Sequence, residues 1–152
     1  MEKKTEEEKI MENRYCLQMV SCGDGCCGNG GSAAENVYST EETLCGKWID
    51  GKPIYRKVIP GTLANESGNG IVFTNVSDLK IDKVVNLYGN LVDGVNNSQI
   101  MLQTSYNRTN GLFGAVNLFY QNNNGNIFYQ FLNNDGFFSG VTAYVIIEYT
   151  KQ

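Results

Sequence analysis

Cysteine is the residue type whose spacing first suggests chemistry in this sequence. Cys22, Cys26 and Cys27 fall in the glycine-rich stretch CGDGCC, and Cys16 and Cys45 flank it. Structural zinc sites use two separated cysteine pairs with two-residue gaps, often completed by histidine, and this chain contains no histidine. We therefore expect no metal site and favour free thiols in a reducing cytoplasm. Inter-chain disulfides formed after release from a cell, and a cysteine-only site, are the alternatives.

Acidic residues give little support for catalysis. Hydrolysis by paired carboxylates needs two acids held at a set separation, whereas the acids of the C-terminal part are sparse and lie near expected turns or at the end of the last strand. They are Asp78, Asp82, Asp93, Asp135 and Glu148. A hydroxyl or thiol nucleophile would lack a histidine base. The stretch CGDGCC lacks the Lys-Ser/Thr ending of a phosphate-binding loop. We expect no catalytic residue, no cofactor and no enzymatic activity.

The overall charge and hydropathy exclude several kinds of partner. The net charge of −4 gives the chain no electrostatic footprint for nucleic acid or anionic lipid. No apolar run reaches the roughly 18 residues of a membrane-spanning helix. The opening MEKKTEEEKI lacks the apolar core of a secretion signal, so we expect a protein made in a cytoplasm and not exported by a cleaved signal. The four Asn-X-Ser/Thr sequons then reflect the high asparagine content.

An uneven distribution of charge divides the chain into two parts. Nine of the first 14 residues are charged, and the spacing of apolar residues predicts a helix over about residues 4–20. Residues 21–36 have the composition of a flexible, glycine-rich linker. A lone helix of this length is marginal in water. Residues 1–36 are therefore expected either to anchor the chain in a larger assembly or to form a frayed, solvated arm.

Residues 37–152 have the composition of a β domain. Asparagine and glycine suit tight turns, and the aromatic and β-branched residues suit a pleated surface. Turn signals such as NNNGN at residues 122–126 separate apolar runs. The predicted strands are 53–59, 70–76, 83–88, 99–106, 112–121, 126–132 and 141–150. We expect a mainly β domain, an antiparallel sandwich or jelly-roll-like fold.

The stretch KWIDGKPIYRKVI, residues 47–59, contains the single tryptophan and an Asp50–Gly51 pair. Asp-Gly between apolar residues is a strong hairpin signal, and Pro53 fits the start of a strand because it has no N–H to donate. The stretch is thus predicted to be a hairpin that opens the β domain. Trp48, Pro53 and Tyr55 are expected to set packing and register.

Alternation in the strand that follows gives it two distinct faces. Ile54, Arg56 and Val58 share one face, which we take as the candidate for the interior, and Tyr55 lies on the other. Arg56 is then expected to reach a partner subunit.

A ligand, if there is one, is expected at the asparagine-rich loops around residues 96–98, 107–111 and 122–126. The candidate ligand-binding residues are Asn97, Asn107, Tyr120, Asn123 and Asn124. Exposed aromatic and amide side chains are the usual components of carbohydrate sites on β-sandwiches. Phe113, Phe119, Phe128 and Phe131, by contrast, are interpreted as core or subunit-interface residues, because aromatic side chains in strands are buried more often than not.

Three strings in the sequence carry a resemblance to a known module. YSTEE at residues 38–42, GKWIDGKPIYRKVI at 46–59 and the terminal EYTK at 148–151 resemble the C-terminal β-rich module of tailed-bacteriophage virion proteins, of the head-fibre and tail- or baseplate-fibre type. VSDLKIDKVVNLYG, at residues 76–89, is also similar. The resemblance covers about residues 37–152 and brings no catalytic residues with it.

The resemblance implies a displayed domain on a phage particle. The protein would form a homotrimer, would attach to phage capsid or tail proteins through residues 1–36, and could bind a bacterial surface glycan. It would be assembled in the host cytoplasm and carried in the virion. A glycan-binding lectin or adhesin of prophage origin and a glycan depolymerase are the alternatives.

Overall fold

The computed structural model describes residues 36–92, 98–108 and 111–152 of the chain. The helix predicted over residues 4–20 and all of the predicted linker, residues 21–36, except Asn36 lie outside these residues. So do Asn97 and four of the cysteines, Cys16, Cys22, Cys26 and Cys27. Of Asn107 only the backbone is described. No membrane-spanning helix occurs in the part of the chain that the structure describes.

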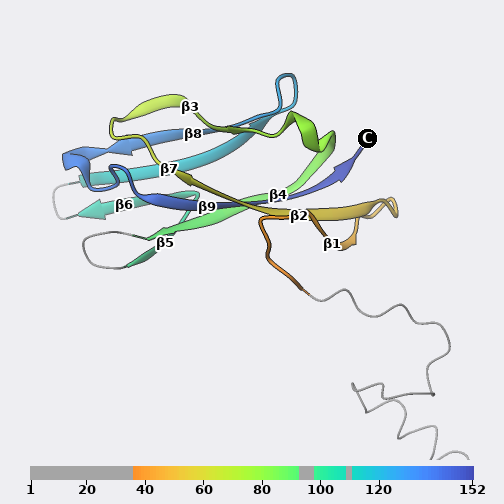
Figure 1. Cartoon of the computed structure of the whole chain (residues 1–152). Helices are drawn as coiled ribbons and strands as arrows, with labels where there is room; N and C mark the ends of the chain where they lie inside the picture. The colour runs from red at the N-terminus through yellow and green to blue at the C-terminus, as the bar shows by residue number, and fades with distance from the viewer. Residues whose placement is uncertain (1–35, 93–97, 109–110) are drawn as a thin grey trace, which may run out of the picture. The chain divides into compact units, whose positions relative to one another are not determined.

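Two antiparallel β-sheets stack face to face, as the layers in Figure 1 show. Sheet A has the strand order β1-β2-β9-β4-β5, and sheet B has the order β3-β8-β7-β6. In chain order the strands are β1 (Thr43–Lys47), β2 (Pro53–Thr62), β3 (Gly68–Asn75), β4 (Ile81–Val92), β5 (Gln99–Met101), β6 (Thr104–Arg108), β7 (Gly111–Gln121), β8 (Asn126–Asn133) and β9 (Thr142–Lys151). Short 3-10 turns, η1 (Ser77–Leu79) and η2 (Asn134–Gly136), precede β4 and follow β8. The mainly β, antiparallel prediction is confirmed.

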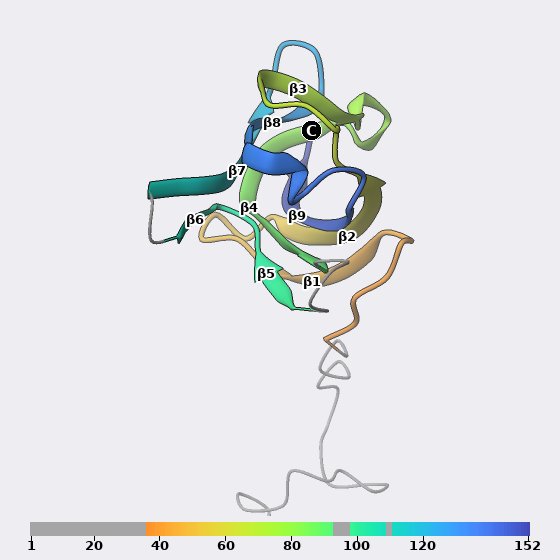
Figure 2. The same ribbon diagram turned by 90° about the vertical axis from the view of Figure 1, so that its left-hand side faces the viewer.

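Long-range pairing holds both sheets together. β9 lies between β2 and β4, with Tyr55 opposite Tyr149 and Thr62 opposite Thr142 in the β2 pairing. β3 pairs with β8, which follows it by more than 50 residues. The side view in Figure 2 shows the two layers edge-on. The last strand is therefore fully paired within its own chain.

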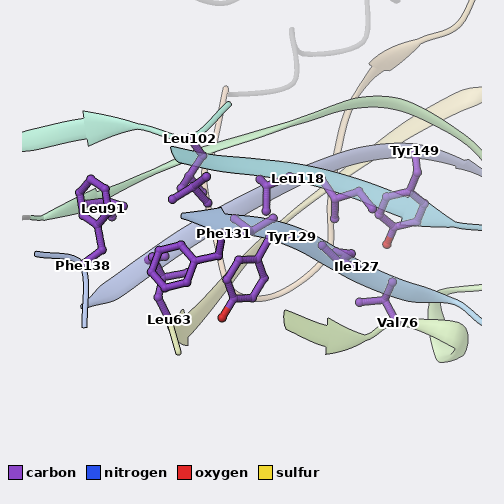
Figure 3. Close-up of a cluster of buried hydrophobic side chains, with 14 of the residues drawn as sticks. Leu63, Val76, Leu91, Leu102, Leu118, Ile127, Tyr129, Phe131, Phe138 and Tyr149 are labelled. Atoms are coloured by element: carbon purple, nitrogen blue, oxygen red, sulfur yellow. The ribbon is translucent and has the colours of Figure 1, made fainter. Parts of the chain in front are cut away.

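The core lies between the sheets and is built by side chains that alternate along the strands. Along β9, Ala143, Val145, Ile147 and Tyr149 are completely buried and point towards sheet B. Sheet B contributes large side chains from β7 and β8 to the same cluster, which Figure 3 shows. They include Val116, Leu118, Ile127, Tyr129 and Phe131. Burying each large apolar side chain contributes about 1.5–3 kcal/mol, so this layer dominates the stability of the sandwich.

Six of the predicted strands correspond to single strands of the structure, namely β2, β3, β4, β7, β8 and β9. The single strand predicted over residues 99–106 is wrong, because this segment is divided between two sheets. β5 pairs with β4 in sheet A, and β6 pairs with β7 in sheet B.

Gln103 makes the crossing between the sheets possible. It adopts a left-handed conformation with φ +68°, while the N–H of the preceding Leu102 still donates to Gly89 of sheet A at 2.9 Å. The Gln103 side-chain amide then donates to the Leu118 carbonyl at 2.9 Å and accepts from the Leu118 N–H at 2.7 Å. A side chain thus satisfies backbone groups of β7 at the point where strand pairing is interrupted.

Candidate functional site

The stretch KWIDGKPIYRKVI forms the hairpin between β1 and β2. Gly51 has φ +86°, and its N–H donates to the Trp48 carbonyl at 2.9 Å. Asp50 Oδ1 accepts a hydrogen bond from the Lys52 N–H at 3.0 Å, and β2 begins at Pro53. The predicted turn and strand start are therefore confirmed.

The two faces of β2 are the reverse of those expected. Tyr55 and Ile59 pack against the core, whereas Val58, on the same face as Ile54, points to the outer face of sheet A. The reason is long-range, because β2 is held in register by β9 and Tyr55 lies opposite the inward-pointing Tyr149. The expectation that Ile54 and Val58 face the interior is wrong.

A nearly buried ion pair lies on the outer face of sheet A. Arg56 Nη2 and Nε lie 2.7 Å and 2.8 Å from Glu148 Oε1, and the two side chains are 10% and 14% exposed. Burial acts to lower the pKa of Arg56, but the hydrogen bond and charge of Glu148 outweigh it, so the net shift is upward. An inter-subunit contact through Arg56 stays a prediction, and its guanidinium already has an acidic partner in its own chain.

The segment that leads into the sandwich, residues 36–42, covers this ion pair, and we call it the entry segment. Asn36 Oδ1 accepts a hydrogen bond from Arg56 Nη1, and the Tyr38 ring centre lies 4.3 Å from the guanidinium carbon. The Tyr88 hydroxyl lies 3.2 Å from Glu148 Oε1 and 3.3 Å from the Tyr38 hydroxyl. These contacts hold the entry segment against the outer face of sheet A.

A second set of polar contacts ties the entry segment to β9. Glu42 accepts hydrogen bonds from the Tyr149 hydroxyl and from Lys151 Nζ, the latter at 2.6 Å. Burial acts to raise the pKa of Glu42, but the hydrogen bonds from Lys151 and Tyr149 outweigh it and hold the pKa below its ordinary value. The end of β9 therefore stabilises the entry segment as long as Glu42 is ionised.

Cys45 is a half-buried free thiol close to the ion pair. Burial raises the pKa of Cys45, so the sulfur stays protonated at neutral pH and is a poor nucleophile or metal ligand. Among the described residues, no group of three or more histidine, cysteine or acidic side chains could hold a metal ion. Asp82 pairs instead with Lys52 at 2.6 Å on the exposed surface.

The outer face of sheet B has a different character. Phe119 of β7 and Phe128 of β8 lie opposite each other and stack, with ring centres 5.4 Å apart and an angle of 13° between the planes. Val72 of β3 lies opposite Phe128 and is 51% exposed. The next row of outward side chains pairs Asn117 with Gln130.

Amide groups border this aromatic row on both sides. Gln130 Nε2 donates to Asn69 Oδ1 at 3.0 Å on one side. On the other side Gln121 lies opposite Asn126, whose side-chain oxygen accepts from Asn75 at 2.6 Å. We call the set Asn69, Val72, Asn117, Phe119, Phe128 and Gln130 the amide–aromatic face. Residues 111–133, which form β7, β8 and their hairpin, include no charged residue.

The structure describes the side chains of three of the predicted ligand-binding residues, Tyr120, Asn123 and Asn124. Asn123 and Asn124 are exposed in the hairpin between β7 and β8, where Asn124 Oδ1 accepts from the Asn126 N–H at 3.0 Å and helps to form the turn. Tyr120 is partly buried against the core, and burial raises its pKa. The structure does not bring these three side chains together as a site.

The amide–aromatic face was not selected because the strand aromatics were interpreted as core or subunit-interface residues. Phe131, which is 4% exposed, belongs to the core, whereas Phe119 is 39% exposed and does not. The signal that could have revealed this was the two-residue period of the strands. Phe119 shares its parity with Asn117, and Phe128 shares its parity with Gln130, so each phenylalanine alternates with amides that belong outside.

Comparison of the chain with protein-family models, with curated proteins and with solved structures finds no match.

Proposed function

We propose that this chain is a structural protein of a tailed-bacteriophage virion, a short head fibre, decoration protein or tail-fibre-like protein. Residues 1–36 attach it to capsid or tail proteins. Residues 37–152 form a β-sandwich, wound in a jelly-roll-like manner, that is displayed outward and contacts the bacterial surface. The protein assembles as a homotrimer in the host cytoplasm and is carried in the virion.

The resemblance to phage virion proteins is the observation that carries this proposal. Two of the resembling strings, residues 38–42 and 46–59, form the entry segment, β1, the Asp50–Gly51 turn and the first half of β2. The most specific string is thus the part of the fold that connects the sandwich to whatever precedes it. A connector of this kind is what a displayed module needs, because it must fix the domain to a variable anchor.

The described side chains favour display over catalysis. Three of the described acids form structural ion pairs, Glu148 with Arg56, Asp82 with Lys52 and Glu42 with Lys151, and we infer that the protein is not an enzyme. The second candidate function is a glycan-binding lectin or adhesin of prophage origin. The uncharged amide–aromatic face favours it, because such a surface suits a polyhydroxyl ligand without requiring a virion.

A trimer must use surfaces other than the last strand, since β9 is paired on both sides within its own chain. The free edges of the sheets, β1 and β5 in sheet A and β3 and β6 in sheet B, are the candidates for strand-to-strand contacts. Sedimentation at micromolar concentration tests this part of the proposal. A trimer is expected, and a monomer would refute it.

Purified phage particles test the location. A virion fraction from cells producing the phage should contain the full chain in a fixed copy number by quantitative mass spectrometry. Deleting residues 1–36 should leave a folded sandwich in the lysate and remove it from the particles. A chain confined to the lysate, with particles complete without it, would leave the lectin or adhesin as the better interpretation.

A further inference from the structure

The outer faces of the two sheets differ in how their polar groups are used. On the outer face of sheet A, Arg56 and Glu148 pair with each other, and the entry segment covers this pair. On sheet B the outward side chains are amides and aromatics, and the strands that carry them contain no charge. The outer face of sheet B takes part in neither the core nor the contacts of the entry segment. Its amide and aromatic side chains are therefore open to an external ligand.

We propose that the amide–aromatic face binds an uncharged carbohydrate chain. This inference rests on the proposed function, because it names the class of bacterial-surface ligand that the displayed domain would contact. The site is a flat strip on β3, β8 and β7, and it lies apart from the loop residues that sequence reasoning selected.

The aromatic row supplies the surface on which a sugar ring can lie. Phe119 and Phe128 keep a parallel, offset arrangement across two strands, and Val72 continues the row on β3. The ring faces of phenylalanine carry negative quadrupole charge, which attracts the weakly positive C–H groups on the apolar side of a pyranose. The two rings already pack against each other, so part of their side-chain freedom is lost before binding.

The amides supply matching hydrogen bonds. The Gln130–Asn69 contact uses one donor and one acceptor, and no other hydrogen bond within the described part of the chain uses Gln130 Oε1 or the Asn69 amino group. An interlocked amide pair thus presents one acceptor and one donor side by side, the arrangement that neighbouring hydroxyl groups require. Asn117 adds a second amide opposite Gln130.

The spacing and the charge select the ligand class. Residues two apart on one strand lie about 6.8 Å from each other, so Phe128 and Gln130 can contact the face and the hydroxyl edge of the same sugar residue. A phosphate or carboxylate ligand would call for arginine or lysine, and residues 111–133 contain neither. The net charge of −4 further disfavours polyanions.

Binding of the full chain to immobilised polysaccharides tests the proposal. The neutral probes are a glucan, a galactan, a mannan and an oligomer of N-acetylglucosamine, and the anionic probe is alginate. We expect retention on at least one neutral probe and none on alginate. Phe119→Ala and Asn117→Ala should each weaken that binding by about tenfold.

Tyr144→Ala is the matched control. Tyr144 lies on the outer face of sheet A and is 41% exposed, against 39% for Phe119, so its truncation removes a similar exposed aromatic and should leave binding unchanged. The urea midpoint of each variant is measured alongside its binding, and a loss of binding counts only where the midpoint is unchanged. This separates lost binding from lost folding. Failure of every neutral probe, equal binding to alginate, or equal sensitivity to Tyr144→Ala would overturn the proposal. So would a Phe119→Ala protein that binds normally but falls from a trimer to a monomer, because the face would then be a subunit interface.

The proposed function is tested separately by the virion fraction. Wild-type particles that contain the chain, combined with blank polysaccharide probes, would remove the carbohydrate site and leave the virion role intact. Carbohydrate binding by a chain that never enters particles would do the reverse.

Discussion

Replacing Arg56 by methionine is the sharpest test of how the entry segment is held. Methionine keeps most of the aliphatic length and removes the guanidinium. The Glu148 carboxylate, 14% exposed, then loses two contacts of 2.7 and 2.8 Å. It retains only the Tyr88 hydroxyl, at 3.2 Å, among the contacts described above. Tyr38 also loses the cation over its ring.

The expected loss follows from these contacts. Removing one partner of a buried ion pair costs about 3–5 kcal/mol, and we take about 3 kcal/mol because both side chains keep some contact with solvent. For an m-value near 1.5 kcal/mol per molar, the urea midpoint should fall by about 2 M. Trp48 fluorescence and far-UV circular dichroism report the transition. The double variant Arg56→Met, Glu148→Leu should recover most of the loss, because no uncompensated charge remains.

Lys52→Met is the control for this experiment. Lys52 also forms an ion pair, at 2.6 Å with Asp82, but the two side chains are 46% and 40% exposed. Solvent screens such a pair, and the midpoint should not shift measurably. A midpoint for Arg56→Met equal to that of Lys52→Met would refute the reasoning, and a double variant no better than the single one would show that packing matters more than charge.

Three further outcomes follow from the same structure. Gly114→Ala would place a Cβ 2.2 Å from the ring of the fully buried Phe138, so a loss of about 1–3 kcal/mol is expected in urea unfolding; Gly46→Ala, whose nearest atom lies at 3.9 Å, serves as its control, and equal midpoints for the two variants would contradict the packing. The lowered pKa of Glu42 means that its stabilising effect is complete above 4.5, the ordinary value, and disappears as the pH falls through the folded-state pKa. The stability difference between the wild type and Glu42→Gln should therefore be largest near neutral pH and shrink in acid, and a difference independent of pH would argue against the ionised contact. Gln103→Leu removes both hydrogen bonds to Leu118 and should cost about 2 kcal/mol, with faster amide hydrogen exchange at Leu118; unchanged exchange there would contradict the bridging role.

Local features of the fold could be predicted from the sequence. The Asp50–Gly51 turn and the start of β2 at Pro53 follow from backbone preferences of single residues, and both are confirmed. The long strand at the C-terminus also follows from its own composition, because VTAYVIIEYT is apolar or β-branched at every position except Glu148. These predictions need no knowledge of the rest of the chain.

Features that depend on distant partners could not be predicted in the same way. The inward face of β2 is decided by its pairing with β9, some 90 residues away, and alternation alone leaves two equal choices. The break between β5 and β6 depends on the two sheets being separate layers, and the run QIMLQTSY over residues 99–106 contains no glycine, proline or asparagine to mark it. The positive φ of Gln103 has no glycine or asparagine to announce it.

The candidate site shows the same limit. Arg56 was expected to reach a partner subunit from the strand face that it shares with Ile54 and Val58, and that contact stays a prediction; its acidic partner within the chain was not foreseen. Glu148, its partner, lies 92 residues later in the chain and is brought opposite only by β9. Phe119 and Phe128 were assigned by the average behaviour of aromatics, whereas their parity with neighbouring amides carried the correct information.

A reconstruction of a virion that contains this chain tests the central claim most directly. The account predicts density for a β-sandwich on the particle surface, attached through the side at which the entry segment joins sheet A, with the amide–aromatic face of β3, β8 and β7 open to solvent. A particle without such density, or one in which that face is packed against capsid or tail protein, would contradict it.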